Sequence, residues 1–408
     1  MANSAKEQLL SIFQAALSAV EGRAVVKRYL SSRPFSGEVN LVAIGKAATS
    51  MAWGAWDVLG ETISRSLVIT KKGHSEEGFP FECFEAAHPV PDESSLEAGR
   101  RLLGFVTSAP ANSRFLFLIS GGSSSLVESL PSGVSLEDLR RLNEWLLASG
   151  MEIGVMNAVR KRFSRLKGGG LIPYLRKHPA LSLMISDVAN DDPAVIGSGL
   201  LVYEAREISP DVLERLPPWL RDRIGSHVPS SVDISCVPSI ENRVVANNGM
   251  AIEGAVEAAK RFGLEVFPHY EPYGGEVTWL AHQFVEEVRR GPPGLYVWGG
   301  ESTIALPPHP GRGGRNQSLA LEAARLLVGN DTILFLAAGT DGTDGPTQEA
   351  GGLVDGDTVS RGERRGMRVT EALRNADAGS FLALSGDLVR TGPTGTNVMD
   401  LVLALKQG

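Results

Sequence analysis

Residues 115–126 read FLFLISGGSSSL, and this stretch is the clearest indication of the fold class. Five apolar residues in succession, 115–119, are typical of a buried strand. Small residues then end the strand abruptly: Ser120, Gly121, Gly122, Ser123 and Ser124. At the carboxyl end of a strand in an open α/β sheet, amide and hydroxyl donors without bulk predict a seat for an anionic group. A flexible turn or a serine helix cap would have the same composition.

Short β-rich runs alternate with longer helical patterns along the rest of the chain. We expect strands at 40–44, 66–70, 114–119, 181–186, 243–246, 264–268, 295–298, 332–337 and 398–405. We expect helices at 47–59, 94–107, 136–147, 152–165, 249–262, 277–290 and 317–327. This alternation predicts an α/β protein with largely parallel sheets.

The size of the chain predicts two domains. With 408 residues, of which 43% are hydrophobic, it exceeds the length at which one hydrophobic core usually stops growing. The segment 210–238 is richer in proline and charge, which predicts a domain boundary within 228–238. The expected division is therefore an N-terminal α/β domain, 1–235, and a C-terminal α/β domain, 236–408.

Charge and cysteine content exclude several classes of protein. A formal net charge of -7 argues against nucleic acid as a partner, because phosphate backbones require a concentrated basic surface. Cys83 and Cys236 are the two cysteines, and neither belongs to a CxxC or Cys/His pair that could hold zinc. We expect a reduced, cytoplasmic protein without disulfides or structural metal.

The first twenty residues have the pattern of an amphipathic surface helix rather than of a signal peptide. Lys6, Glu7 and Gln14 interrupt the apolar residues, which fall at helical spacing. No stretch of the sequence is long and apolar enough to cross a bilayer. The sequence therefore predicts a soluble protein with no membrane partner.

Glycines gather directly after the predicted strands in both halves, at positions 45, 121–122, 299–300 and 339–345. Such turns let backbone amides approach a phosphate at the start of the next helix, although glycine also ends strands in α/β proteins generally. The chain has no GxxxxGK[ST] loop, no GxGxxG fingerprint after its first strand and no HRD or DFG signature. P-loop NTPases, standard dinucleotide enzymes and protein kinases are thus not supported.

Two cations lie in these glycine-rich turns. Lys46, in AIGKAA (43–48), follows a strand at the start of a predicted helix, where the helix dipole disfavours a cation unless an anion joins it. Arg315, in GRGGRNQ (311–317), precedes another helix, and its guanidinium fork matches phosphate oxygens at two points. The alternative for each is a solvated side chain in a surface turn.

Five aspartates follow apolar strands in ISDVANDDP (185–193) and AAGTDGTDGPT (337–347): Asp187, Asp191, Asp192, Asp341 and Asp344. Carboxylate oxygens suit Mg²⁺ that arrives with a nucleotide. Asp also caps helices and forms turns, so each one individually fits that interpretation as well.

Ten segments, in this order and across nearly the whole chain, resemble the class II glycerate 2-kinases, whose C-terminal half is the MOFRL domain. They are AIGKAA, KKGH, HPVPDE, ISGGSSSL, VRKRFSRLKGG, ISDV, DDPAVIGSG, GGRNQ, AAGTDGTDGPT and TGPTGTNVMDL. The resemblance implies a Rossmann-like N-terminal domain and an active site in a cleft between the two domains. It also implies ATP, a divalent cation such as Mg²⁺, and phosphorylation of D-glycerate at its 2-hydroxyl. Its cleft lysine and arginine fall on Lys46 and Arg315.

From the residues and this resemblance together we expect Lys46, Arg315 and Asp187 to be catalytic, with Lys46 and Arg315 bracketing the transferred phosphoryl group. Asp187 and Asp341 are the candidate ligands of Mg²⁺, and one aspartate is expected to accept the proton of the attacking hydroxyl. The residues expected to bind nucleotide or substrate are Gly45, Ser120, Gly121, Gly122, Ser123, Ser124, Lys167, Gly300, Glu301, Gly313, Gly314, Asn316, Gly339, Thr340, Asp341 and Gly342. A homodimer is a further expectation.

The chain departs from the usual family pattern at Arg162, where a histidine is common, at Gly170, where KGGR is usual, and at Leu200, where Pro-Thr often follows SG. These changes concern the substrate rather than the phosphoryl-transfer loops. Two other classes of function are alternatives. The first is a hydroxypyruvate reductase or other NAD(P)-dependent oxidoreductase, although the sequence lacks the dinucleotide fingerprint that such an enzyme should carry. The second is a nucleotide-binding regulator without catalytic activity.

Overall fold

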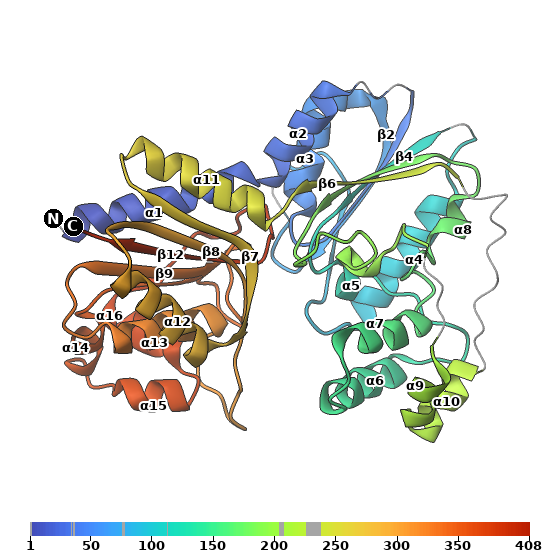
Figure 1. Cartoon of the computed structure of the whole chain (residues 1–408). Helices are drawn as coiled ribbons and strands as arrows, with labels where there is room; N and C mark the ends of the chain where they lie inside the picture. The colour runs from blue at the N-terminus through green and yellow to red at the C-terminus, as the bar shows by residue number, and fades with distance from the viewer. Residues whose placement is uncertain are drawn as a thin grey trace. The chain divides into compact units, whose positions relative to one another are not determined.

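The computed structural model describes residues 2–33, 35, 37–75, 78–111, 113–203, 208–225 and 238–408. These residues form two compact units, each with its own sheet (Figure 1). Unit N is Val25–Val245, and unit C combines Met1–Ala24 with Ala246–Gly408. The two predicted α/β domains are confirmed.

The sheet of unit N has the order β3-β2-β1-β4-β5-β6. Its strands are β1 (Val39–Ile44), β2 (Ile63–Lys71), β3 (Cys83–Ala86), β4 (Arg114–Ile119), β5 (Ala180–Ile185) and β6 (Ile240–Ala246). Every pairing from β3 through β5 is parallel. The order of these strands is that of a Rossmann fold, in which the chain reverses direction across the sheet between β1 and β4.

Unit N owes its parallel sheet to strands that are apolar on both faces. All six residues of β1 are buried, and so are Phe115 to Ile119 of β4. Phe117 and Ile119 share one core with Ala98 and Leu102 of α4. The helices of the unit are α2 (Gly22–Ser32), in which the chain enters it, α3 (Ala48–Leu59), α4 (Glu93–Thr107), α5 (Ser123–Leu126), α6 (Leu136–Ala148), α7 (Ile153–Arg162), α8 (Ile172–Leu175), α9 (Pro210–Arg215) and α10 (Pro218–Gly225).

The sheet of unit C has the order β11-β10-β9-β12-β8-β7. Its strands are β7 (Val266–Glu276), β8 (Gly294–Thr303), β9 (Ile333–Gly339), β10 (Gly351–Val354), β11 (Leu388–Val389) and β12 (Asp400–Lys406). The sheet is mixed: β7 and β8 pair in parallel, whereas the pairings of β8 with β12, β12 with β9, β9 with β10 and β10 with β11 are antiparallel. The expectation of largely parallel sheets therefore holds for unit N but not for this sheet, in which β9 returns as β10 without a crossover helix.

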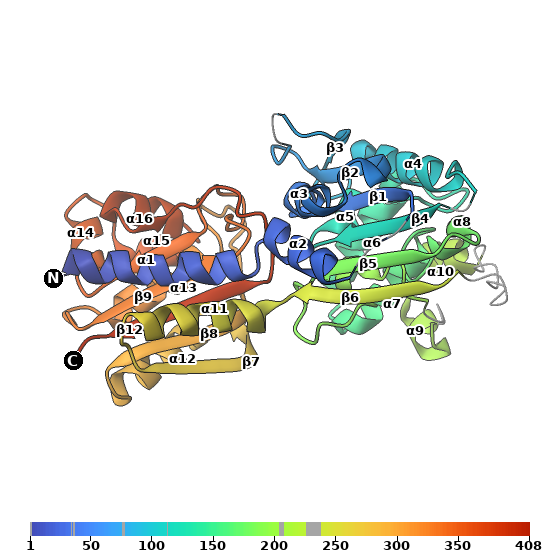
Figure 2. The same cartoon turned by 90° about the horizontal axis from the view of Figure 1, so that it is seen from above.

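Helices cover both faces of the sheet in unit C. In Figures 1 and 2, α1 (Ala2–Ala19) and α11 (Asn248–Arg261) lie on one face. The other face carries α12 (Val277–Arg290), α13 (Arg315–Leu326), α14 (Thr358–Glu363), α15 (Val369–Arg374) and α16 (Ala378–Ser385).

The N-terminal helix α1 belongs to unit C, which differs from the predicted division at 235/236. Its apolar residues Leu9 and Phe13 are buried, and Gly254 of α11 leaves room for Ala15 to Ala19 at close range. The Lys6 ammonium lies 2.6 Å from the carboxylate of Asp355 and 3.2 Å from that of Asp387. The other end of unit N is at Val245, ten residues beyond the predicted boundary; most of the predicted linker, 228–237, lies outside the described residues.

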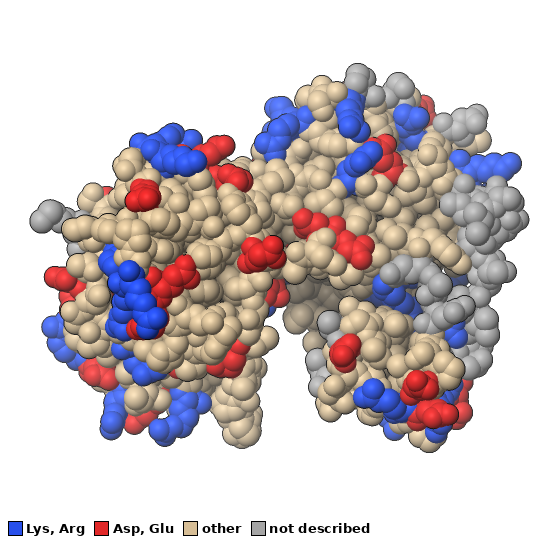
Figure 3. All heavy atoms as spheres, in the orientation of Figure 1, with Lys and Arg blue, Asp and Glu red and all other residues tan. Residues whose placement is uncertain are grey.

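In the part of the chain that the structure describes, no single helix is long and apolar enough to cross a membrane, and only the bent pair of Ser4–Ala19 and Gly22–Ser32 passes that criterion when taken together. On the face shown in Figure 3, Lys and Arg are interspersed with Asp and Glu over each unit.

Candidate functional site

In unit N the turns after β1 and β4 lie at the point where the strand order reverses, which is where ligands bind in open α/β sheets. The two turns are joined directly. The backbone N–H of Lys46 donates to the carbonyl of Gly121 at 3.0 Å, and that of Ala47 donates to Oγ of Ser120 at 3.0 Å. The structure thus brings together two of the segments that the sequence indicated, 45–46 and 120–122.

Glycine is required in both turns for steric reasons. Gly45 has φ +133°, and a Cβ there would lie 2.1 Å from Oγ of Ser120. Gly122 has φ +85°, and a Cβ would meet the ring of His88 at 2.9 Å and Cγ of Lys46 at 3.3 Å. The stem of Lys46 therefore packs against the 121–122 turn. Lys46 itself is half-buried and precedes α3 by two residues, so it does not open the helix as predicted.

Ser123 and Ser124 continue this turn. Oγ of Ser123 is fully buried and makes no hydrogen bond within the described residues. Oγ of Ser124 accepts from Ser198 at 2.8 Å, which attaches the segment after β5 to the turn. A Cβ on Gly197 would lie 2.3 Å from Oγ of Ser123.

The aspartates after β5 have different surroundings. Asp187 follows the strand by two residues and is half-buried at the same end of the sheet as the 120–124 turn, since β5 lies parallel to β4. Asp191 has φ +53°, and Asp192 accepts the backbone N–H of Ala194 at 2.9 Å. The turn-forming interpretation therefore accounts for Asp192.

Lys167 has a buried structural partner in this geometry, and its predicted role in substrate binding stays a prediction. Its ammonium lies 2.7 Å from the carboxylate of Glu128, and the lysine and glutamate side chains are 6% and 0% exposed. Glu128 also accepts from Oγ of Ser164 at 2.5 Å and from the backbone N–H of Ser129 at 2.9 Å. A buried carboxylate requires such partners, and Lys167 supplies the charge.

In unit C the corresponding feature is a charged cluster around Arg315, the first residue of α13. Its Nε donates to Asp400 at 2.6 Å, and its Nη2 donates to Asp400 at 3.2 Å and to Glu301 at 2.7 Å. Asp400 begins β12 and is 3% exposed, while Glu301 on β8 is exposed. Burial raises the pKa of Asp400 to about 6, although the Arg315 guanidinium acts in the opposite direction.

Asp344 occupies the N-terminus of α13. Its carboxylate accepts the backbone N–H groups of Asn316 at 3.1 Å and Gln317 at 2.8 Å, where a helix dipole favours an anion. Gly314 allows this approach, because a Cβ there would lie 2.3 Å from Oδ1 of Asp344. Burial raises the pKa of Asp344 to about 7, against the effect of the two backbone hydrogen bonds. The N-terminus of α13 is therefore occupied by a carboxylate of the protein itself, and the predicted binding of a phosphate by Arg315 stays a prediction.

The other residues predicted in unit C shape the loops around this cluster. Asp341 accepts from the backbone N–H and the hydroxyl of Thr343, at 2.9 and 3.0 Å. Thr340 donates its hydroxyl to the carbonyl of Met399 at 2.6 Å, which ties the 339–345 loop to the start of β12. A Cβ on any of three glycines would clash with a backbone carbonyl or amide at 2.0 to 2.9 Å: Gly300, Gly313 and Gly342. A Cβ on Gly339 would likewise lie 2.6 Å from the carbonyl oxygen of Thr343.

The family described as "Domain of unknown function (DUF4147)" matches residues 8–229, and the MOFRL family matches residues 294–400. A D-glycerate 2-kinase from Thermotoga maritima is 36% identical over 98% of this chain and 98% of its own length. The chain belongs to the glycerate 2-kinase family. A solved structure of a glycerate kinase from the same organism has a TM-score of 0.85 at 35% identity and covers 99% of this chain and 100% of that one.

The family also includes a relative with another name. A protein from Agrobacterium vitis whose provisional name is hydroxypyruvate reductase is 34% identical to this member of the glycerate 2-kinase family, over 90% of this chain and 98% of its own.

The sequence analysis did not single out two residues that lie beside Arg315 in this member of the glycerate 2-kinase family. Asp400, in the quoted segment TGPTGTNVMDL, holds Arg315, and the only signal was a single acid before a buried apolar run. Tyr273 of β7 has a buried hydroxyl with no hydrogen-bond partner in the described ranges. Burial raises the pKa of Tyr273 well above its usual range, and the neighbouring Asp400 acts in the same direction.

The carboxylates predicted to bind Mg²⁺ could each supply one ligand, but they do not form a complete metal site. Within the described residues, no group of three or more His, Cys, Asp or Glu side chains could hold a metal ion. Mg²⁺ commonly binds through one or two carboxylates together with substrate phosphates, so separate residues such as Asp187 and Asp341 suit a nucleotide-borne Mg²⁺ better than a resident one.

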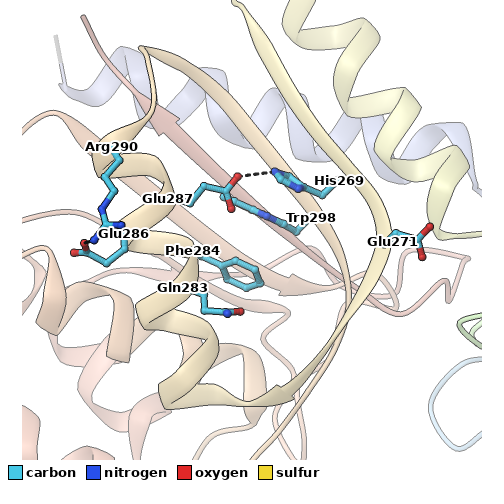
Figure 4. A pocket seen from close by; sticks show the side chains of 8 residues that line it. All are labelled: His269, Glu271, Gln283, Phe284, Glu286, Glu287, Arg290 and Trp298. Atoms are coloured by element: carbon cyan, nitrogen blue, oxygen red, sulfur yellow. Dashed lines mark hydrogen bonds and ion pairs between the residues drawn. The ribbon is translucent and has the colours of Figure 1, made fainter.

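A separate cavity of about 450 Å³ lies between β7, β8 and α12 (Figure 4). The rings of His269 and Trp298 stack there at 5.2 Å, and Nε2 of His269 lies 2.9 Å from the carboxylate of Glu287. Glu286 pairs with Arg290 at 3.1 Å. None of the predicted site residues lines this cavity, which lies beside β7, the edge strand of the sheet.

Proposed function

We propose that this protein transfers the γ-phosphoryl group of ATP to the 2-hydroxyl of D-glycerate, giving 2-phosphoglycerate and ADP. The observation that carries the proposal is the similarity, over essentially the whole chain, to a D-glycerate 2-kinase. The Rossmann strand order, with two joined glycine turns where that order reverses, supports it because such turns present backbone amides to phosphate groups.

Phosphoryl transfer depends mainly on positioning and on cancelling negative charge, so cations and amide donors carry most of the catalysis. In unit N, we assign Lys46 to the transferred phosphoryl group. Gly45 and the 120–124 turn would provide amide and hydroxyl donors, among them the buried Oγ of Ser123. The packing of the Lys46 stem on Gly122 restricts where the ammonium can lie.

In unit C, we assign Arg315 to the same transfer. Its hydrogen bonds to Asp400 and Glu301 use Nε and Nη2, which leaves the N–H groups of Nη1 for a phosphoryl oxygen. Two carboxylates thus fix the guanidinium plane before substrate arrives. The loops at Gly300, 313–316 and 339–342 hold this arrangement through the close backbone approaches described above.

The aspartates have two roles in the proposal. Asp187 and Asp341 would hold the Mg²⁺ that accompanies ATP, which neutralises phosphate charge when bound. One of the two would accept the proton of the attacking hydroxyl.

The direct test is a coupled assay of the purified chain with D-glycerate, ATP and Mg²⁺. Enolase consumes only the 2-phosphate, so we expect glycerate-dependent ADP release to be matched by enolase product. ADP release without enolase product would place the phosphate on another oxygen, and no glycerate-dependent release would contradict the kinase assignment.

One observation favours a second candidate, since a relative carries the name hydroxypyruvate reductase. The turn after β1 argues against it, because it reads GKAA and lacks the second and third glycines that a dinucleotide pyrophosphate requires. We expect no oxidation of NADH or NADPH with hydroxypyruvate; measurable oxidation would support the reductase.

A further inference from the structure

Helix α7 of unit N ends in three cationic residues, all half-buried: Arg160, Lys161 and Arg162. Arg160 donates to Oδ1 of Asn143 at 3.1 Å and to Oδ1 of Asn157 at 3.2 Å. Arg162 differs from Arg160, because within the described ranges it makes neither a hydrogen bond nor an ion pair, although its Nε is buried.

A half-buried guanidinium whose Nε–H is buried without an acceptor is unfavourable. Arginine stays charged in proteins, and a buried charge without partners costs folding free energy. The C-terminal dipole of α7 favours a cation by only about 0.3–1 kcal/mol at the surface, which does not supply the missing hydrogen bonds. Burial alone lowers the pKa of Arg162, and no neighbouring carboxylate raises it.

A chain of contacts connects this end of α7 with the turn after β4. The ammonium of Lys161, next to Arg162, donates to the carbonyl of Ala194 at 3.2 Å. The segment that contains Ala194 continues to Ser198, which bonds to Ser124 of the turn. After α7, the backbone N–H of Gly168 donates to the carbonyl of Ser198 at 2.9 Å. Lys161 and Gly168, which lie on either side of Arg162 in the sequence, thus both contact the segment 191–199, and Gly197 of the same segment lies against the unpaired hydroxyl of Ser123.

We propose that Arg162 binds the carboxylate of the hydroxy-acid acceptor and thereby selects acids over neutral alcohols. A guanidinium offers parallel N–H donors that match two carboxylate oxygens, and an incoming anion would compensate the charge that unit N leaves unpaired. The assignment rests on the proposed function, since it names the residue that recognises the acceptor. A nucleotide phosphate presents similar oxygens, so the experiment must separate the two sources.

The test compares Arg162→Gln and Arg162→Lys with the control Arg160→Gln, a half-buried arginine of the same helix turn. We expect Arg162→Gln to raise the KM for D-glycerate at least roughly tenfold, the loss typical of a hydrogen bond to a charged group, and to change the KM for ATP less than about twofold. Arg162→Lys should lie between wild type and Arg162→Gln. The thermal midpoint of Arg162→Gln should stay or rise, whereas Arg160→Gln should lower it.

An unchanged KM for D-glycerate would overturn the proposal. A rise confined to the KM for ATP would overturn it too, because the bound oxyanion would then be a phosphate. Titration calorimetry without ATP measures binding of the acceptor alone, so it distinguishes failure of this inference from failure of the proposed kinase activity. The wild type should bind D-glycerate and not glycerol, and Arg162→Gln should lose that preference. If the wild type bound the acid through Arg162 but did not phosphorylate it, the inference would stand and the kinase assignment would fall.

Discussion

The guanidinium of Arg315 donates two hydrogen bonds to the carboxylate of Asp400, with Nε 2.6 Å from Oδ2 and Nη2 3.2 Å from Oδ1. Asp400 lies between β8 and β9, and its partners in those strands are Gly300 and Gly339. A Cβ on Gly339 would lie 3.5 Å from Oδ1 of Asp400, whereas a Cβ on Gly300 would meet the backbone of Tyr273 at 2.2 Å. Asp400 is therefore a positioning residue for Arg315.

Replacing Asp400 with asparagine should disorder the guanidinium while keeping an oxygen acceptor. We expect kcat for glycerate phosphorylation to fall by roughly ten- to a hundredfold, because a misplaced transition-state partner loses most of its effect. The KM values should change little. The matched control is Glu301→Gln, which removes the exposed partner of the same arginine. A larger loss for Glu301→Gln than for Asp400→Asn would contradict the role given to Asp400.

Lys46→Met keeps the stem that packs on Gly122 and removes only the charge. We expect a loss in kcat of roughly a hundredfold or more, with the thermal midpoint nearly unchanged. Lys72→Met is the control, since Lys72 follows β2 in the same unit and its side chain is 62% exposed. If both variants retained full activity, Lys46 would be a solvated turn residue.

Glu128→Gln should destabilise unit N by about 3–5 kcal/mol, because it leaves the Lys167 ammonium buried without its counter-charge. Chemical denaturation measures this loss. Glu137→Gln on α6 removes one partner of an exposed ion pair and should have no comparable effect. Unchanged stability together with a raised KM would instead restore Lys167 as a substrate-binding residue.

Asp344 predicts a pH dependence of stability. Burial raises its pKa to about 7, above the value of about 4 in an unfolded chain, so the native state binds the proton more tightly. Its contribution is fully present below about pH 4 and is lost as the pH rises to about 7. The thermal midpoint of Asp344→Asn relative to wild type should therefore increase across this range. Curves that stay parallel from pH 4 to pH 8 would show that Asp344 titrates normally.

Long, strongly patterned elements could be predicted from the sequence. The apolar run before Ser120 became β4, and the apolar stripe of 277–290 became α12 with the predicted bounds. Strands β3, β10 and β11 were missed because they are short, and β10 begins with two glycines. The glycines pack against the neighbouring strand and α13, which no local pattern reveals.

Candidate site residues could be recognised in the sequence where a local rule was broken. Lys46 and the glycine before it stand directly after a predicted strand, so a single segment of the sequence reveals them. The structure joins 45–46 to 120–122 by a backbone hydrogen bond. Partners from distant segments could not be recognised in the sequence. Glu128 pairs with Lys167, 39 positions away, and Asp400 pairs with Arg315, 85 positions away. The same limit applied to α1, whose burial against α11 depends on residues about 240 positions later.

The most direct test of the account is glycerate-dependent ADP release by Arg315→Ala beside Arg312→Ala. Both arginines lie in the 311–317 segment, but Arg312 pairs with Glu349 and does not join the Asp400 cluster. We predict that Arg315→Ala lowers kcat by a hundredfold or more, about 2.7 kcal/mol of transition-state stabilisation, while Arg312→Ala stays within about threefold of wild type. Activity of Arg315→Ala within threefold of wild type, at saturating ATP and D-glycerate, would contradict the proposed phosphoryl transfer.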